Sequence, residues 1–216
     1  ESWKSFTEEI IETSKRKPVI SKSKYEVNTI DTITADEGDR IKTGINEFDR
    51  VLGGGLMPGS VILLGGDPGI GKSTLAMQAA ANIKQKVLYA TGEESEKQIK
   101  LRASRLKLNS SEFYVQAETN LSDILGAINQ LSPSVVVIDS IQTMYRAELD
   151  NSPGTITQIR ECTSLLMEEA KKKHYSVIII GHVTKEGMIA GPKLLEHMVD
   201  TVIQFEGESN YSFRIL

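Results

Sequence analysis

The sequence contains a single cysteine and no long apolar run, and these two shortages exclude several classes of protein. Cys162 is the only cysteine in 216 residues, so no disulfide can form within the chain and a reducing compartment is favoured. No apolar stretch approaches the about 18 residues that a membrane helix needs, and no signal-peptide pattern opens the chain. We therefore expect a cytoplasmic protein without membrane contact.

An excess of charge of one sign is also missing. The 25 Lys and Arg residues are slightly outnumbered by 29 Asp and Glu residues, which gives a net charge of −4. This balance argues against a basic surface that coats nucleic acid, but it leaves a local basic patch open. With 39% hydrophobic and 25% charged residues, the composition is that of one folded domain with its own core.

Residues 1–40 differ in character from the rest of the chain. They are polar and rich in turn-forming residues, as in Lys15–Pro18 and Asp36–Asp39. We interpret them as an N-terminal arm or linker that precedes a core domain over residues 41–216. Within the arm, Trp3–Ile11 is a short amphipathic stretch. Docking of this stretch onto a partner and folding back onto its own domain are both open interpretations.

Strand and helix patterns alternate from residue 41 onward. Five short apolar runs have the composition of strands that are buried on both faces of a parallel sheet. These runs are Val61–Gly65, Val87–Tyr89, Glu112–Val115, Val135–Asp139 and Val177–Gly181. The last two apolar stretches, Met198–Phe205 and Tyr211–Leu216, predict an antiparallel hairpin. The expected fold is α/β, with a mostly parallel central sheet, helices on both faces and a C-terminal hairpin.

Two of the helices between the strands carry clear sequence signals. Asn120 is the expected N-cap of a helix whose apolar residues follow helical spacing. These apolar residues are Leu121, Ile124, Leu125 and Ile128. A second helix is expected over Thr155–Lys173, with one buried stripe and a basic C-terminus. The predicted stripe consists of Ile156, Ile159, Cys162, Leu166 and Ala170.

A complete phosphate-binding motif lies between the strand Val61–Gly65 and the helical stretch Thr74–Ile83. Residues 66–73 read Gly-Asp-Pro-Gly-Ile-Gly-Lys-Ser, which satisfies G-x-x-x-x-G-K-[ST] in its required context. Such a loop turns its backbone N–H groups toward phosphate, while Lys72 reaches the β- and γ-phosphates and Ser73 binds Mg²⁺. We predict that ATP or ADP binds here with Mg²⁺. The predicted nucleotide-binding residues are Gly66, Asp67, Pro68, Gly69, Ile70, Gly71, Lys72, Ser73 and Thr74.

Four further polar residues follow the strands that flank this loop. Asp139 closes an apolar run, at the sheet edge where ligands bind, and is the expected second magnesium ligand beside Ser73. Glu93 and Glu94 follow the strand Val87–Tyr89, and a carboxylate there can activate water. We favour Glu93 as the base over Glu94. His182 follows Val177–Gly181 and is a candidate for a γ-phosphate contact; packing is its alternative role.

Motifs along most of the chain resemble those of one family of RecA-like P-loop ATPases. They run from the lead-in before the phosphate loop to Asp200. The segments are Gly44–Leu56, Gly66–Thr74, Gly92–Ser95, Leu101–Leu106, Ile138–Thr143, Gln158–Thr163, Gly181–Gly187, Ile189–Pro192 and Leu195–Asp200. From Arg40 to Leu216 the chain resembles the bacterial RadA (Sms) family.

This resemblance implies an ATP hydrolase that depends on DNA and acts in DNA repair and recombination. It implies a homo-hexamer that works on single-stranded or branched DNA by branch migration, together with recombinase and helicase proteins. By position, Arg102 resembles an adenine-stacking residue. The family's N-terminal zinc finger, its Lys-Asn-Arg-Phe-Gly motif and its Lon-like domain do not occur in these residues. We therefore expect the chain to be an excised ATPase core with weak turnover by itself.

The resemblance also indicates how DNA would be contacted. The loops Gln142–Thr157 and Val183–Pro192 correspond to the DNA-facing loops of a hexamer channel. Arg146, Lys185 and Lys193 are the basic residues in or beside them, so a ring of copies would be needed for affinity. Ordinary surface connections are the alternative interpretation of these loops. A second function also stays open, a nucleotide-sensing module in which ATP controls oligomerisation with little turnover.

Overall fold

A computed structural model describes residues 29–32, 40–182, 191–207 and 214–215 of the chain. The chain divides into two units, Glu1–Asp36 and Glu37–Leu216. In the first unit the described residues 29–32 contain a 3₁₀ turn over Ile30–Thr32. The stretch Trp3–Ile11 lies outside the described residues, so both interpretations of it stay open. The boundary predicted at residue 40 likewise stays a prediction.

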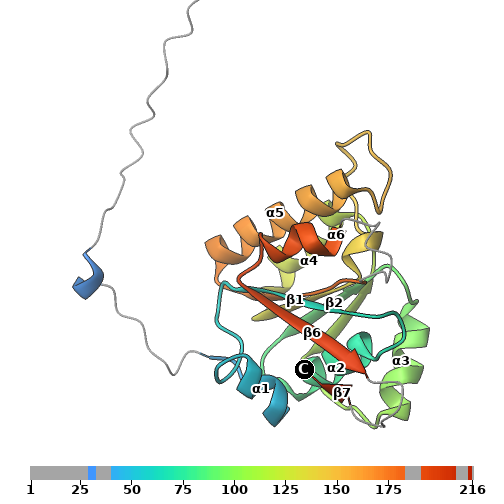
Figure 1. Ribbon diagram of the computed structural model, residues 1–216. Coiled ribbons are helices and arrows are strands. Elements are labelled where there is room, and N and C mark those ends of the chain that lie inside the picture. The colour runs from blue at the N-terminus through green and yellow to red at the C-terminus, as the bar shows by residue number, and fades with distance from the viewer. Residues whose placement is uncertain (1–28, 33–39, 183–190, 208–213, 216) are drawn as a thin grey trace, which may run out of the picture. The chain divides into compact units, whose positions relative to one another are not determined.

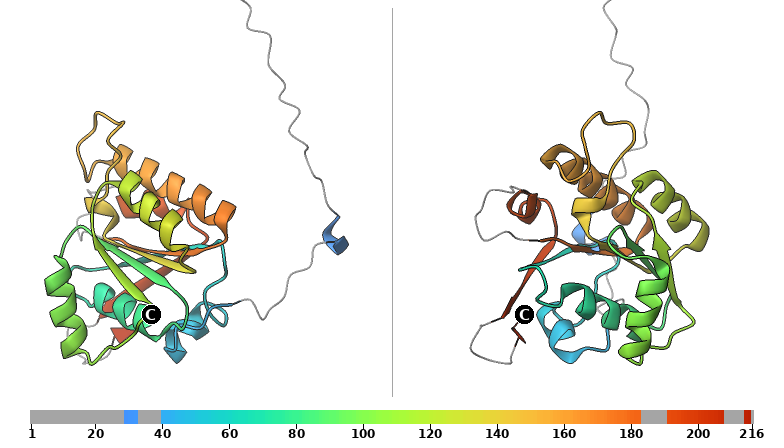
Figure 2. Two further views of the ribbon diagram at one scale, coloured as in Figure 1. Left: turned by 180° about the vertical axis from the view of Figure 1, so that it is seen from behind. Right: turned by 90° about the vertical axis from the view of Figure 1, so that its right-hand side faces the viewer.

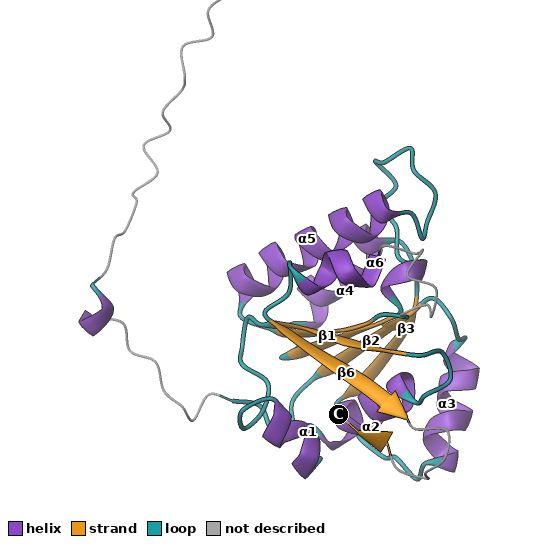
Figure 3. Cartoon of the chain, viewed as in Figure 1, coloured by secondary structure: helices purple, strands orange, loops and turns teal. Residues whose placement is uncertain are grey.

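The second unit contains a central sheet with the strand order β3-β2-β4-β5-β1-β6-β7 (Figure 3). All neighbouring strands are parallel except β6 and β7, which are antiparallel. Their bounds are β1 Val61–Gly66, β2 Val87–Thr91, β3 Phe113–Ala117, β4 Val135–Asp139, β5 Ser176–Ile180, β6 Thr201–Gly207 and β7 Arg214–Ile215. Strands β1, β2, β4 and β5 are buried along their whole length, as their unbroken apolar runs predict. The same prediction for the run Glu112–Val115 is wrong, because β3 is an edge strand and none of its five residues is buried.

Helices cover both faces of the sheet, as Figures 1 and 2 show. On one side lie α1 (Asn46–Val51), α2 (Lys72–Asn82) and α3 (Glu96–Arg105); on the other lie α4 (Leu121–Leu131), α5 (Ile156–Lys173) and α6 (Gly191–Glu196). Each face has its own apolar cluster, one around α2 and one around α4 and α5. This is the RecA-like α/β fold that the sequence predicts. None of the described helices has both the length and the apolar character that crossing a bilayer requires.

The predicted helix caps are present. The Asn120 side chain accepts a hydrogen bond from the Ser122 N–H at 3.1 Å and so begins α4. Along α5 the predicted stripe is buried at Ile159, Cys162, Leu166 and Ala170. Ile156 is an exception, because it stands at the first position of the helix with 48% of its surface exposed.

Several predicted bounds move by one to three residues, for reasons of pairing and capping. Helix α2 begins at Lys72, two residues before the predicted Thr74, because Gly71 takes φ 114° and forms the N-cap. Strand β2 continues to Thr91, where it pairs in register with β4. The hairpin of β6 and β7 is confirmed as antiparallel, but β6 itself joins β1 in parallel.

The burial of α5 predicts a contrast between two of its apolar residues. We expect Leu166→Ala to lower the free energy of unfolding by about 2–5 kcal/mol, because it leaves a cavity in a fully buried cluster. Ile156→Ala is the matched control on the same helix and should stay within about 0.5 kcal/mol of the unchanged chain. Urea unfolding followed by circular dichroism measures both. Equal losses would contradict the packing of α5 described here.

Candidate functional site

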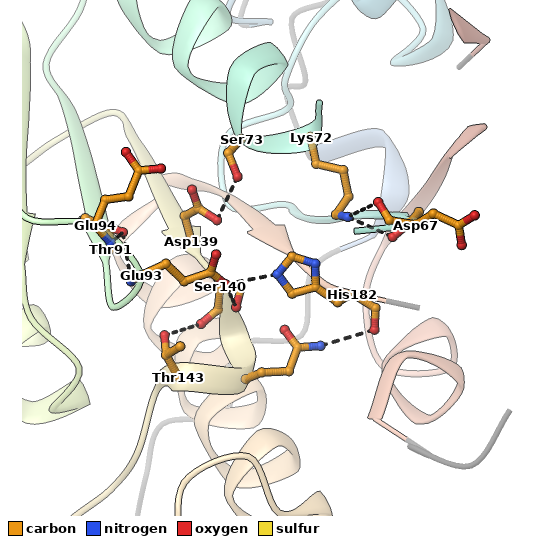
Figure 4. Close-up of polar contacts among 12 residues, drawn as sticks. Asp67, Lys72, Ser73, Thr91, Glu93, Glu94, Asp139, Ser140, Thr143 and His182 are labelled. Atoms are coloured by element: carbon orange, nitrogen blue, oxygen red, sulfur yellow. Dashed lines mark hydrogen bonds and ion pairs between the residues drawn. The ribbon is translucent and has the colours of Figure 1, made fainter. Parts of the chain in front are cut away.

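The candidate site lies where parallel strands end at one edge of the sheet. The phosphate loop follows β1, the Glu93 loop follows β2, Asp139 ends β4, and His182 follows β5. Figure 4 shows these side chains gathered at that edge. Because a parallel sheet brings the carboxyl ends of its strands together, residues far apart in sequence become neighbours there.

The phosphate loop depends on glycine at three positions. Gly66, Gly69 and Gly71 have φ angles of 144°, 76° and 114°, which other residues rarely adopt. A Cβ atom at Gly66 would also lie 2.4 Å from the Phe205 carbonyl oxygen. The loop therefore curls tightly between β1 and α2, and its tip over residues 67–69 is exposed.

Lys72 lies inside the curl of this loop. Its Nζ donates hydrogen bonds to the carbonyl oxygens of Gly66 at 2.7 Å and Asp67 at 2.9 Å, and its side chain is almost fully buried. Burial lowers the pKa of Lys72, while the nearby carboxylates of Asp139 and Glu93 act to raise it. The ammonium group is thus held beside the first residues of the loop, as the motif requires of a phosphate ligand.

Ser73 and Asp139 form the candidate magnesium site. The Ser73 hydroxyl donates to Asp139 Oδ1 at 3.1 Å, and the Tyr89 hydroxyl donates to Oδ2 at 2.5 Å. Burial raises the pKa of Asp139, and the two hydrogen bonds partly oppose this effect. A hydroxyl and a carboxylate are oxygen ligands of the kind that Mg²⁺ takes. The described residues hold no cluster of three or more His, Cys, Asp or Glu side chains for a metal. In proteins Mg²⁺ is usually held by one or two side chains together with substrate phosphates and several waters.

The two adjacent glutamates point to different surroundings. Glu93 Oε1 accepts a hydrogen bond from the Ser140 hydroxyl at 2.5 Å and lies 2.9 Å from His182 Nε2. The hydrogen bond with His182 is the main reason that the pKa of Glu93 is lowered, so Glu93 is a carboxylate at neutral pH. Glu94 instead forms an ion pair with Arg102. In Figure 4 the Glu94 side chain points away from His182.

His182 completes a short chain of polar contacts. Besides its contact with Glu93, its Nδ1 is buried and has no hydrogen-bond partner among the described residues. Its backbone carbonyl accepts a hydrogen bond from Gln142 Nε2 at 3.5 Å. His182 therefore joins the carboxylate that follows β2 to the loop that follows β4. The predicted contact with a γ-phosphate stays a prediction.

No motif in the sequence indicates which residues hold the glutamate loop in place. Thr91 Oγ1 accepts hydrogen bonds from the N–H groups of Glu93 at 3.2 Å and Glu94 at 3.3 Å. At Gly92, an added Cβ would lie 2.3 Å from Thr143 Oγ1 and 2.5 Å from Thr119 Cγ2. No motif indicates Tyr89 either. It lies two residues before Thr91 on β2, and residues at this spacing share one face of a strand.

The remaining candidates lie at the margin of this site. Arg102 lines a cavity of about 580 Å³ together with Glu94, Gln98, Leu101 and Arg105. Its stacking on adenine stays a prediction. In the loop Gln142–Thr157, Arg146 Nε lies 3.6 Å from Glu148 Oε2, and Arg146 Nη1 lies 3.9 Å from Glu161 Oε2. These two carboxylates partly neutralise the charge of Arg146. Lys185 and the Lys193 side chain, in or beside the second loop, lie outside the described residues.

The sequence of the chain is similar to those of several known proteins. The AAA domain family matches residues 29–188. The DNA repair protein RadA of Bacillus subtilis is 50% identical over 100% of this chain and 49% of its own length. That of Listeria monocytogenes is 53% identical over 87% of this chain and 42% of its own length. The chain thus spans about half the length of the curated relatives it matches.

A solved structure supports the same grouping. The crystal structure of the RadB recombinase aligns with a TM-score of 0.60 and 25% identity, over 81% of this chain and 86% of that one. The resemblance to bacterial RadA and the RecA-like fold expected from the motifs are therefore confirmed.

The close packing around Gly92 generates a test of how firmly the glutamate loop is held. We expect Gly92→Ala to lower the free energy of unfolding by about 1–3 kcal/mol, because the new methyl group overlaps two threonine side chains. Gly126→Ala, in the open on α4, is the control and should stabilise the chain by about 0.4–1 kcal/mol. Thermal unfolding measures both. A Gly92→Ala chain as stable as the control would show that the loop is loosely packed.

Proposed function

Because the chain belongs to the AAA domain family, we propose that it is the ATP-hydrolysing core of a DNA repair and recombination motor. The observation that carries the proposal is the convergence of three functions at one sheet edge. These are the phosphate-binding loop with Lys72, the oxygen pair of Ser73 and Asp139, and the carboxylate of Glu93. A P-loop ATPase requires these three functions together.

Each of these residues has a distinct role in the proposed reaction. The loop N–H groups and Lys72 bind the phosphates of ATP, which fixes the γ-phosphate at the carboxyl ends of the strands. Ser73 and Asp139 would hold Mg²⁺, which would supply positive charge beside the phosphate oxygens. Glu93 orients the attacking water and accepts its proton.

The contacts favour Glu93 over Glu94 as the base. Glu93 is ionised at neutral pH, because its hydrogen bonds with His182 and Ser140, and after them the nearby positive charges, lower its pKa. Glu94 is occupied by Arg102, so its oxygens already have a cationic partner. A carboxylate that orients water must keep an oxygen available for it, and among the described residues Glu93 Oε2 accepts no hydrogen bond.

The DNA-related part of the proposal rests on relatives rather than on the site. The matched relatives from Bacillus subtilis and Listeria monocytogenes are DNA repair proteins, and RadB is a recombinase. We propose that this chain acts on single-stranded or branched DNA as a homo-hexamer in the cytoplasm, with recombinase and helicase proteins as partners. Because Arg146 is partly neutralised by two glutamates, a ring of copies would supply the basic charge that one subunit lacks.

ATP turnover by the full-length protein, with and without single-stranded DNA, tests this function. We expect DNA to stimulate turnover several-fold. Lys72→Ala should abolish turnover with an intact fold, because it removes a phosphate ligand that packs against backbone carbonyls and not in an apolar cluster. Turnover that DNA leaves unchanged would favour the nucleotide-sensing module instead. Near-normal turnover by Lys72→Ala would exclude this loop as the ATP site.

The assignment of the base is tested by two matched variants. Glu93→Gln should lower turnover by about 10²–10⁴-fold with nearly unchanged ATP affinity, because the amide keeps the size of the side chain but cannot take a proton. Glu94→Gln should have a much smaller effect. Steady-state turnover and equilibrium ATP binding separate the two properties. The reverse order would assign the base to Glu94, and equally small effects would remove the role from both.

A further inference from the structure

We propose that Tyr89 is a positioning residue that orients the Asp139 carboxylate for magnesium. Its hydroxyl holds one carboxylate oxygen, so that the other faces Ser73. The inference rests on the proposed function, because it concerns the metal that accompanies the nucleotide. The sequence motifs do not include Tyr89 in the site, and it would bind neither nucleotide nor metal itself.

Strand register brings Tyr89 and Asp139 onto one face of the sheet. Tyr89 on β2 is the partner of Val137 on β4, and Asp139 lies two residues further along the same strand. Since residues two apart share a face, the Tyr89 and Asp139 side chains point to the same side. Helix α2 covers that side and supplies Ser73 from its first turn.

The three groups form a continuous line of hydrogen bonds. Tyr89 Oη donates to Asp139 Oδ2 at 2.5 Å, and Ser73 Oγ donates to Asp139 Oδ1 at 3.1 Å. Each carboxylate oxygen thus has a different donor from a different element. The carboxylate cannot rotate about its last bond without losing both hydrogen bonds, so Oδ1 stays on the side of the phosphate loop.

The core fixes the position of the tyrosine hydroxyl. The Tyr89 side chain is fully buried, and its ring packs edge-on against Phe113 with the centroids 5.8 Å apart and the planes at 84°. Such an aromatic pair leaves the ring little freedom to move. The hydroxyl is therefore a rigid donor, in contrast to the Ser73 hydroxyl, which can rotate toward a metal.

Loss of this hydroxyl would affect one part of nucleotide binding selectively. Asp139 is only 2% exposed, so without Tyr89 its Oδ2 would lack a donor and water could not easily replace it. The carboxylate would then turn toward other donors and present a less suitable oxygen to the metal. The loop N–H groups and Lys72 do not depend on Tyr89, so metal-independent contacts with the phosphates would remain.

Tyr175 offers a matched control for removal of a hydroxyl. Its ring is also buried, in the apolar cluster on the opposite face of the sheet. Its hydroxyl has no hydrogen-bond partner among the described residues. Tyr175→Phe therefore removes the same atom from a buried ring without changing the candidate site.

The experiment measures binding of a fluorescent N-methylanthraniloyl ATP to the full-length protein at increasing magnesium concentrations and in EDTA. We expect Tyr89→Phe to need about tenfold more magnesium for half-maximal enhancement of binding, the loss that one hydrogen bond to a charged group corresponds to. Its binding in EDTA should equal that of the unchanged protein. Tyr175→Phe should match the unchanged protein in both conditions. Tyr89→Phe should also have no further effect on the magnesium dependence in an Asp139→Asn background, because it acts through that carboxylate.

Three outcomes would overturn the inference. Tyr89→Phe could show the magnesium dependence of the unchanged protein, or it could lose binding equally with and without magnesium, as a purely structural residue would. It could also remain additive with Asp139→Asn. If magnesium does not promote nucleotide binding by the unchanged protein either, the proposed function itself fails, and this result is distinct from a failure that is confined to Tyr89.

Discussion

The buried carboxylate of Asp139 is the group on which the arrangement of the site depends. A carboxylate at the end of a buried strand is costly unless donors surround it, and here the donors come from β2 and from α2. Burial of Asp139 therefore ties the phosphate loop, the second strand and the fourth strand together. A shift of any one of these elements would leave a buried charge with an unmade hydrogen bond.

A second set of contacts extends from this centre toward the surface. Ser140 follows Asp139 directly and donates to Glu93, while His182 approaches the same glutamate oxygen from the end of β5. Gln142, which lies two residues beyond Ser140, donates to the His182 carbonyl. A change at Glu93 would therefore alter contacts with both Ser140 after β4 and His182 after β5. Under the proposed function, such a link would connect the state of the nucleotide with the surface that we propose meets DNA.

The first part of the loop after β4 is itself held firmly. The Gln158 side chain accepts a hydrogen bond from the Arg146 N–H at 2.9 Å and donates to the Arg146 carbonyl at 3.1 Å. Tyr145 also pairs with the chain where α4 begins. Its N–H donates to the Thr119 carbonyl at 2.9 Å, and its carbonyl accepts from the N–H of Leu121, the first residue of α4, at 2.9 Å. The first part of this loop is therefore an ordered extension of the sheet edge.

The sequence by itself determined the features that neighbouring residues encode. The phosphate loop, the four buried strands, the Asn120 cap and the closing hairpin all follow from short patterns, because glycine conformation, apolar runs and capping act over a few residues. Only the tertiary structure decided which side chains meet across the sheet. The pairing of Tyr89 with Asp139, the separate partners of Glu93 and Glu94, and the parallel entry of β6 beside β1 depend on register and strand order. Those properties arise from contacts between distant segments, which no local pattern specifies.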